Sequence, residues 1–177
     1  MRIAFTGSHR CGKSTLIAKV AEDLDGYEVV DEPYIHLEEE GHDFAHPPSL
    51  EDFLAQLECS LKLVDDAGAD LLFDRCPIDF VGYLLAHVEA DAFDLDVWID
   101  RIRAALRRLD LMVFVPIEDP DRIKVSRSED LDLRADVDAK LKELILDDRL
   151  DIGVEVLVVE GKRSARLAQV LARVRRG

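Results

Sequence analysis

The stretch from residue 7 to residue 14, Gly-Ser-His-Arg-Cys-Gly-Lys-Ser, constrains this chain more than any other part of its sequence. It satisfies the phosphate-loop pattern G-x-x-x-x-G-K-[ST] at every fixed position, and Thr15 follows it. Residues 2–6 before it are typical of a short apolar strand, and apolar residues recur at helical spacing from Leu16 to Leu24. A strand, a glycine-containing loop and a helix in this order make a cradle for phosphate groups. The sequence therefore predicts a nucleotide-phosphate site near the start of the chain.

Each position of this loop has an expected task. The glycines let the backbone turn so that its N–H groups face the phosphates, and the helix start adds a positive end. Lys13 is expected to reach the β- and γ-phosphates, and the Ser14 hydroxyl is expected to ligate Mg²⁺. We therefore expect ATP and Mg²⁺ as the cofactors. The expected nucleotide contacts are Gly7, Ser8, His9, Arg10, Cys11, Gly12, Lys13, Ser14 and Thr15.

Strand-like apolar segments alternate with amphipathic helical segments along the whole chain. Strands are expected at residues 2–6, 27–30, 70–74, 111–115 and 154–159. Helices are expected around residues 16–24, 50–64, 77–88, 98–109, 137–145 and 167–174, whereas residues 34–48 are expected to be irregular. Ser49 and Asp52 have a spacing close to that of a capping box at a helix start. The alternation predicts an α/β fold of three layers, with a five-stranded parallel sheet inside one domain, residues 1–177.

Composition excludes several classes of partner. The 23 basic and 38 acidic residues give a formal charge of −15, which disfavours a nucleic-acid backbone as partner. No apolar stretch approaches the ~20 residues of a membrane span, so we expect neither a membrane partner nor a targeting segment. The cysteines are scattered and form no C-x-x-C pair, which favours a reducing, cytoplasmic location. The sequence leaves both a monomer and a homodimer open.

Charged residues follow the predicted strands, and ligands of parallel α/β sheets bind beyond the carboxyl ends of the strands. Asp74 is expected to hold Mg²⁺ directly or through water, with a helix N-cap as the alternative role. Arg75 is expected to bind the phosphate acceptor, and its alternative role is an ion pair with Asp31, Glu32 or Asp79. Asp31 and Glu32 are adjacent in an extended segment, so they point opposite ways. We favour Glu32 as the carboxylate that faces the site and acts as general base.

The segment after the fourth strand, residues 117–149, is a possible lid. It carries a basic cluster of Arg122, Lys124, Arg127 and Arg134 among several acidic residues. A mobile segment at this place in the fold could bring positive charge to the transferring phosphoryl group. The alternative is a solvated, charged helix face.

These residues together give the chain a family resemblance. It resembles the small P-loop kinases of the nucleoside and nucleotide kinase fold, and the compact AAA-type ATP-binding proteins of the nicotinamide-riboside-kinase-like kind. Residues 30–34, Val-Asp-Glu-Pro-Tyr, are similar to the Glu-Pro motif of deoxynucleoside kinases, which implies that Glu32 is the catalytic base. Asp74 and Arg75 are similar to the acidic-Arg pair that ends the third strand in those kinases and in thymidylate kinases.

The same resemblance implies the sheet order 2-3-1-4-5. Arg122 and Arg127 resemble lid arginines, which in the family contact adenine and phosphates. Two features depart from the family pattern. Cys76 stands where deoxynucleoside kinases often have serine. The segment between the second and third strands is short of the aromatic and glutamine side chains expected to contact a nucleobase, and Gln56 and Phe53 are the nearest of that kind.

We therefore predict an ATP-dependent small-molecule kinase that transfers the γ-phosphate to a nucleoside- or nucleotide-like acceptor. The alternative is a regulatory ATP-binding protein or ATPase with no small-molecule acceptor. A Ras-type GTPase is disfavoured because the chain contains no Asn and so lacks the N-K-x-D motif for guanine. The predicted catalytic residues are Lys13, Glu32, Arg75 and Arg127, the predicted metal ligands are Ser14 and Asp74, and Arg122 is a predicted nucleotide contact.

Overall fold

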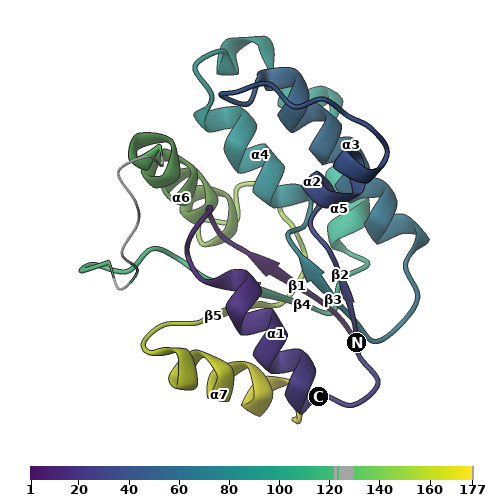
Figure 1. The fold of residues 1–177 in the computed structure, drawn as a ribbon, viewed down its shortest axis with the longest axis vertical. Helices are drawn as coiled ribbons and strands as arrows, with labels where there is room; N and C mark the ends of the chain where they lie inside the picture. The colour runs from purple at the N-terminus through teal and green to yellow at the C-terminus, as the bar shows by residue number, and fades with distance from the viewer. Residues whose placement is uncertain (122, 124–129, 177) are drawn as a thin grey trace.

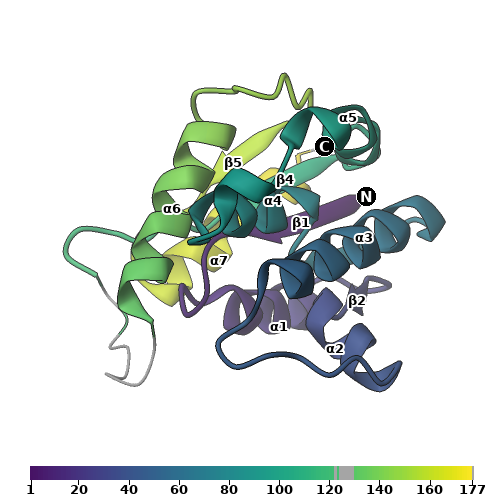
Figure 2. The same cartoon turned by 90° about the horizontal axis from the view of Figure 1, so that it is seen from above.

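The computed structural model describes residues 1–121, 123 and 130–176. These residues form a five-stranded parallel sheet with the order β2-β3-β1-β4-β5, which confirms the expected fold. Helices cover both faces of the sheet (Figure 1, Figure 2). The elements are β1 (Arg2–Thr6), α1 (Lys13–Asp23), β2 (Glu28–Val30), α2 (Pro33–Glu39), α3 (Leu50–Asp66), β3 (Leu71–Asp74), α4 (Pro77–Ala86), the short 3₁₀ turns η1 (Ala90–Ala92) and η2 (Leu95–Val97), α5 (Ile99–Leu106), β4 (Leu111–Phe114), α6 (Leu131–Ile145), β5 (Val156–Val158) and α7 (Arg163–Val174).

The two faces of the sheet bury separate hydrophobic clusters, because successive side chains of a strand point to opposite faces. Ile3 and Phe5 of β1 pack into the cluster that contains the apolar residues of α1 and α7. Ala4 enters the larger cluster under α3, α4, α5 and α6. All three side chains are fully buried. Burial on both faces explains why the strands read as continuous apolar runs rather than alternating ones.

The strand register brings the predicted site residues to one edge of the sheet. Phe5 of β1 pairs with Asp74 of β3, and Thr6 pairs with Phe114 of β4. The phosphate loop therefore leaves β1 beside the point where β3 ends. Because the strands are parallel, the turns that follow β1, β2 and β3 all lie at this carboxyl edge (Figure 1).

One predicted irregular region contains a helix. The prediction for residues 34–48 was wrong over its first part, since α2 spans Pro33–Glu39. Pro33 occupies the first helical turn, where its missing N–H costs nothing, and the Tyr34 hydroxyl bonds Glu38 one turn later at 3.3 Å. The helix is short and mostly polar, so it lacks the long apolar periodicity that sequence reasoning depends on. Gly41 follows with a φ of 89°.

The helices α3 and α6 each begin directly after a residue whose side chain caps the helix N-terminus. The capping box at Ser49 is present, with the Ser49 side chain accepting from the Asp52 N–H and the Asp52 side chain bonding back to Ser49. The helix α6 begins at Leu131, about two turns before the expected residue 137. The Asp130 side chain caps it by accepting from Leu133 N at 2.9 Å. Its first turns are largely exposed, so the apolar pattern begins later than the helix itself.

Gly7 occupies a position that only glycine fits without displacement of the backbone. Its φ is +148°, and a Cβ placed there would lie 2.5 Å from the Val115 carbonyl oxygen. The close approach joins the start of the phosphate loop to the end of β4. A side chain at this position would therefore separate the loop from the sheet.

We expect Gly7→Ala to lower the free energy of unfolding by about 2–4 kcal/mol, because strain and a backbone clash act together. Gly41→Ala is the matched control, since Gly41 also has a positive φ but has no atom within 4 Å of its Cβ position. That control should cost only about 1–2 kcal/mol. Urea denaturation of both variants measures the difference, and equal losses would contradict the role given to the Val115 contact.

Candidate active site

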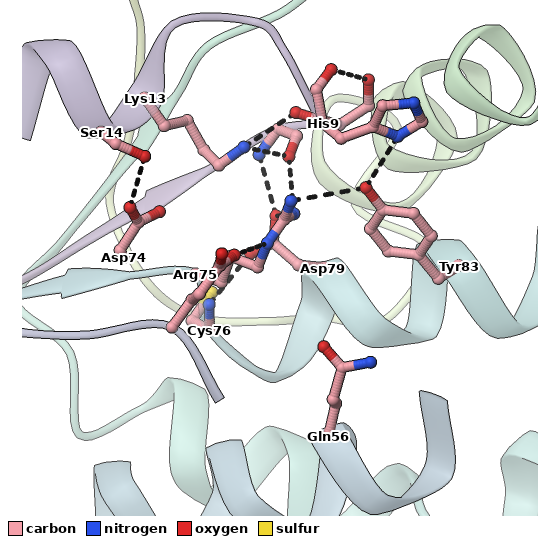
Figure 3. Close-up of polar contacts among 12 residues, drawn as sticks. His9, Lys13, Ser14, Gln56, Asp74, Arg75, Cys76, Asp79 and Tyr83 are labelled. Atoms are coloured by element: carbon pink, nitrogen blue, oxygen red, sulfur yellow. Dashed lines mark hydrogen bonds and ion pairs between the residues drawn. The ribbon is translucent and has the colours of Figure 1, made fainter. Parts of the chain in front are cut away.

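The phosphate loop connects β1 to α1 and closes around the Lys13 side chain. Lys13 Nζ donates to the carbonyl oxygens of Gly7 at 2.9 Å and Ser8 at 2.8 Å, as Figure 3 shows. Gly12 is the N-cap of α1 and has a φ of 94°. Lys13 is almost fully buried, whereas Ser14 and Thr15 are exposed at the start of the helix. The loop thus presents a helix N-terminus, a lysine and a hydroxyl at one place, which suits an anion with a bound cation.

Ser14 and Asp74 meet across the carboxyl edge of the sheet. Ser14 Oγ donates to Asp74 Oδ2 at 2.7 Å, and Asp74 Oδ1 is buried without a hydrogen-bond partner in the described part of the chain. Burial raises the pKa of the Asp74 carboxyl, against the opposing effects of Lys13, the Ser14 hydrogen bond and Arg75. A hydroxyl beside a carboxylate with an unused oxygen is a donor set that fits Mg²⁺.

Arg75 lies at the centre of a hydrogen-bond network beside the phosphate loop (Figure 3). Its backbone has a φ of 78°, and its side chain is only 10% exposed. Nε donates to Glu32 Oε2 at 3.0 Å, Nη1 to the Gly7 carbonyl at 3.1 Å and Nη2 to the Tyr83 hydroxyl at 3.4 Å. Asp79 Oδ1 lies 3.5 Å from Nη1. Burial alone would lower the Arg75 pKa, but Tyr83, Asp79 and Glu32 raise it well above its usual range, so the charge is fixed.

Glu32 rather than Asp31 faces this guanidinium. Glu32 is the N-cap residue of α2 and its side chain is 35% exposed, while Asp31 is exposed. The ion pair that was the alternative reading of Arg75 therefore exists, and it links the ends of β2 and β3. The same contact places a carboxylate next to the start of the phosphate loop.

Tyr83 joins the phosphate loop to the helical layer. Its hydroxyl accepts from Arg75 and lies 3.1 Å from His9 Nδ1, and its ring stacks on Phe53 at 4.9 Å between centroids. Phe53 is only 6% exposed, so this side chain belongs to the core. Gln56 projects from α3 toward the same region in Figure 3, and its Nε2 donates to the Asp52 carbonyl at 3.2 Å.

Asp79 fixes the loop relative to α4. Its carboxylate is fully buried and accepts from Gly7 N and from Cys76 N, both at 2.9 Å. The N-cap of α4 is Cys76, so the alternative role of Asp74 as a cap is wrong. Burial, with a further contribution from Asp79, raises the Cys76 thiol pKa well above its usual range.

A cavity of about 960 Å³ lies beside the phosphate loop and the start of α1. Gly12, Thr15 and Lys19 line one side of it, and Ile123 and residues of the 161–167 segment line the rest. Its position beside the helix start is appropriate for the part of a nucleotide that lies beyond the phosphates.

The predicted lid arginines divide into two groups. Arg122 and Arg127, together with Lys124, lie outside the described residues. Arg134 lies in α6, is 5% exposed and donates to the carbonyl oxygens of His9 and Arg10. The expectation that Arg134 brings charge over a bound nucleotide is therefore not supported by its contacts.

Comparison with known proteins places this arrangement in a family. The family model described as "AAA domain" matches residues 2–166, which includes every element up to the start of α7. The chain belongs to the AAA domain family. No curated protein sequence matches the chain.

Solved structures with the same fold as this AAA domain include two kinases. Deoxyadenosine kinase from M. mycoides with bound dATP is 15% identical, with a TM-score of 0.70 and 99% of each chain covered. The same kinase with dCMP and a flexible dCDP has a TM-score of 0.72 at 15% identity, with 100% of each chain covered. Thymidylate kinase from Candida albicans is 17% identical, with a TM-score of 0.65, covering 98% of this chain and 90% of that one. These similarities establish a P-loop nucleotide kinase fold.

Sequence reasoning missed several residues of the site in this AAA domain. Tyr83 lies four residues after Asp79, so the two share one face of α4, and this spacing was the available signal. Arg166 was not named at all, and Arg134 was named only as a lid residue, although both contact the loop from helices more than a hundred residues away in sequence. No local pattern signals such contacts.

Described helices include none long and apolar enough to cross a bilayer.

Replacing Asp74 by Asn should separate stability from ligand binding. A raised pKa means that folding disfavours the ionised carboxyl, so at pH 7 the neutral side chain should raise the thermal midpoint of the protein without nucleotide. The same change should weaken Mg-ADP binding at least about tenfold, because it removes a charged oxygen ligand. Asp25→Asn, at an exposed site, should change neither quantity. Thermal unfolding and calorimetric titration test both effects, and unchanged Mg-ADP affinity would remove Asp74 from the metal site.

Proposed function

We propose that this protein is an ATP-dependent small-molecule kinase that transfers the γ-phosphate to a nucleoside- or nucleotide-like acceptor. The contact between Glu32 and Arg75, 3.0 Å long and next to the Gly7 carbonyl, carries this proposal. It sets a proton acceptor and a fixed positive charge beside the phosphate loop. Asp74 directly precedes Arg75 and accepts from Ser14 at 2.7 Å, so the proposed metal ligands adjoin the proposed acceptor groups at the end of β3.

In the proposed reaction, the loop amides and Lys13 hold the phosphates of ATP, and the rest of the nucleotide lies in the 960 Å³ cavity. Mg²⁺ held by Ser14 and Asp74 would neutralise charge on the phosphate oxygens. Glu32 takes the proton of the acceptor hydroxyl as the acceptor oxygen bonds to the γ-phosphorus. The bond from the γ-phosphorus to the bridging oxygen breaks, and ADP leaves. Arg75 positions the acceptor oxygen.

The lid proposal applies to the part of the 117–149 segment that precedes α6. In α6 itself, Val137 and Leu141 are fully buried, and Leu141 packs against Gly82 of α4. This helix is therefore part of the packed body. We propose that Arg122 and Arg127, which lie before it in the sequence, contact the nucleotide and its transferring phosphate.

An ATPase without a small acceptor is the second candidate, favoured by membership of the AAA domain family. Hydrolysis needs the phosphate loop and the metal pair but does not need Glu32 beside Arg75. The two candidates differ in what Glu32 contributes. A kinase loses phosphoryl transfer without this carboxylate, whereas a plain ATPase keeps its turnover.

We expect Lys13→Ala to abolish ATP turnover, because it removes the charge that binds the outer phosphates. Glu32→Gln should retain Mg-ATP binding and lose transfer by about a hundredfold or more, the usual contribution of a general base. Asp31→Asn is the matched control, since it changes the neighbouring, exposed carboxylate. Calorimetry with Mg-ATP and a coupled ADP-release assay measure the two steps. Unchanged transfer in Glu32→Gln would exclude Glu32 as the base.

The contacts of Arg75 favour a hydroxyl over a phosphate as the accepting group. All three guanidinium nitrogens already donate, to Glu32, Gly7 and Tyr83. Each terminal nitrogen keeps one further N–H group, which can reach an acceptor hydroxyl. An acceptor that carries its own phosphate would bring a second anion against the Glu32 carboxylate at 3.0 Å from the same guanidinium, and the two negative charges would repel.

With saturating Mg-ADP present, nucleosides should therefore raise the thermal midpoint more than the matching nucleoside monophosphates do. A panel of both, extended to pyridine ribosides and aminoglycosides, makes the comparison. Stronger stabilisation by the monophosphates would contradict a hydroxyl acceptor while leaving the kinase proposal intact.

A further inference from the structure

The five carbonyl oxygens of the phosphate loop from Gly7 to Cys11 all accept hydrogen bonds from cationic side chains. Those of Gly7 and Ser8 accept from Lys13, and that of Gly7 also accepts from Arg75. The next three, at residues 9, 10 and 11, accept from Arg134 and Arg166. A loop that turns its N–H groups toward an anion must place its carbonyl oxygens elsewhere, and each of these five has a positively charged donor.

Arg134 binds the loop from α6 with its whole guanidinium. Nε donates to the His9 carbonyl at 3.0 Å, Nη2 to the Arg10 carbonyl at 3.1 Å and Nη1 to Asp121 Oδ2 at 2.7 Å. Asp121 Oδ1 in turn accepts from Ile123 N at 2.9 Å. Ile123 lines the nucleotide cavity, so Arg134 connects the loop to that wall.

Arg166 makes a corresponding connection to another part of the cavity lining. From α7, Nη1 donates to the Cys11 carbonyl at 2.9 Å, Nε to the Gly161 carbonyl at 3.1 Å and Nη2 to Glu118 Oε1 at 2.9 Å. Glu118 Oε1 also accepts from Gly161 N at 2.5 Å. Gly161 and Arg166 belong to the lining of the same cavity.

Both arginine side chains are buried. Arg134 is 5% exposed and Arg166 is 7% exposed, and all three nitrogens of each donate to protein acceptors. A buried guanidinium with a carboxylate partner is compensated in charge and geometrically specific. A lysine has a single nitrogen and cannot span two carbonyl oxygens and a carboxylate in a plane.

We propose that Arg134 and Arg166 are positioning residues that hold the phosphate loop in its anion-binding shape and connect it to Ile123 and Gly161 in the lining of the nucleotide cavity. Nucleotide affinity then depends on the planar, forked geometry of these side chains as well as on their charge, because the loop is ordered before the ligand arrives. The inference rests on the proposed binding of a nucleotide in this cavity. It does not depend on which acceptor is used, or on whether a phosphoryl group is transferred.

The test uses Arg134→Lys and Arg166→Lys, with Mg-ADP as the probe in calorimetric titration. Each variant should lose at least about tenfold in affinity, measured at a temperature where thermal unfolding shows it folded. Arg103→Lys is the matched control, because Arg103 also donates from a partly buried guanidinium to a carbonyl, that of Leu150 at 2.6 Å, far from the loop in the fold. Its affinity should stay that of the wild type. Equal losses in all three variants, or unchanged affinity in both test variants, would overturn the inference.

Chemical rescue separates geometry from charge. In Arg134→Ala, added ethylguanidinium should restore part of the Mg-ADP affinity, whereas ethylammonium should not, and equal rescue by both would overturn the geometric claim. Asp121→Asn provides a second test if the arginine variants do not fold, since it leaves Arg134 in place. It should lower Mg-ADP affinity about threefold, and unchanged affinity would contradict the role given to the link from Arg134 through Asp121 to Ile123. Wild-type protein that fails to bind Mg-ADP would refute the proposed function as well, whereas binding by wild type with no loss in the variants refutes only this inference.

Discussion

The buried carboxylate of Asp79 is the contact on which the rest of the site depends. It accepts from the backbone of Gly7, the first loop residue, and from Cys76, the N-cap of α4. Bonds to an ionised acceptor are stronger than neutral ones, and removing one partner would leave the others buried and unpaired. The phosphate loop and the turn after β3 are therefore held at a fixed separation. Arg75 lies in that turn, which is why its guanidinium can reach Gly7 and Glu32 together.

The register of the sheet supplies the second constraint. Pairing of Phe5 with Asp74 ends β1 and β3 side by side, so a helix that starts after β1 brings Ser14 to the Asp74 carboxylate. The closeness of Ser14 and Asp74 therefore follows from the main-chain pairing of β1 with β3, and their own side-chain hydrogen bond completes it.

Local signals in the sequence were sufficient for the parts of the fold that are locally determined. The loop pattern, the buried strands and the capping box at Ser49 each depend on residues close in sequence, and the structure contains all of them. The strand order came from family resemblance rather than from periodicity. The helix α2 was missed because it is short and polar, and the start of α6 was misplaced because its first turns are exposed.

The candidate site was predictable to a similar extent. Residues that directly follow strands, such as Asp74, Arg75 and Glu32, could be expected together because parallel strands end at one edge. The contacts of Arg134 and Arg166 with the loop could not be expected, although Arg134 was named in the lid cluster, since both approach the loop from helices 125 and 155 residues away from the carbonyls that they bind. Their function depends on how whole helices pack. In sequence Arg166 resembles any other arginine of an amphipathic helix.

The neutralisation of these cations has a consequence for how a polyphosphate approaches the protein. Arg75, Arg134 and Arg166 each have a carboxylate partner, and the chain as a whole carries a charge of −15. At distances beyond a Debye length, an anion arriving by diffusion encounters repulsion instead of electrostatic steering. The polyphosphate is then bound only through short-range interaction with the dipoles of the loop amides. Added salt, which screens the repulsion, would raise the association rate rather than lower it.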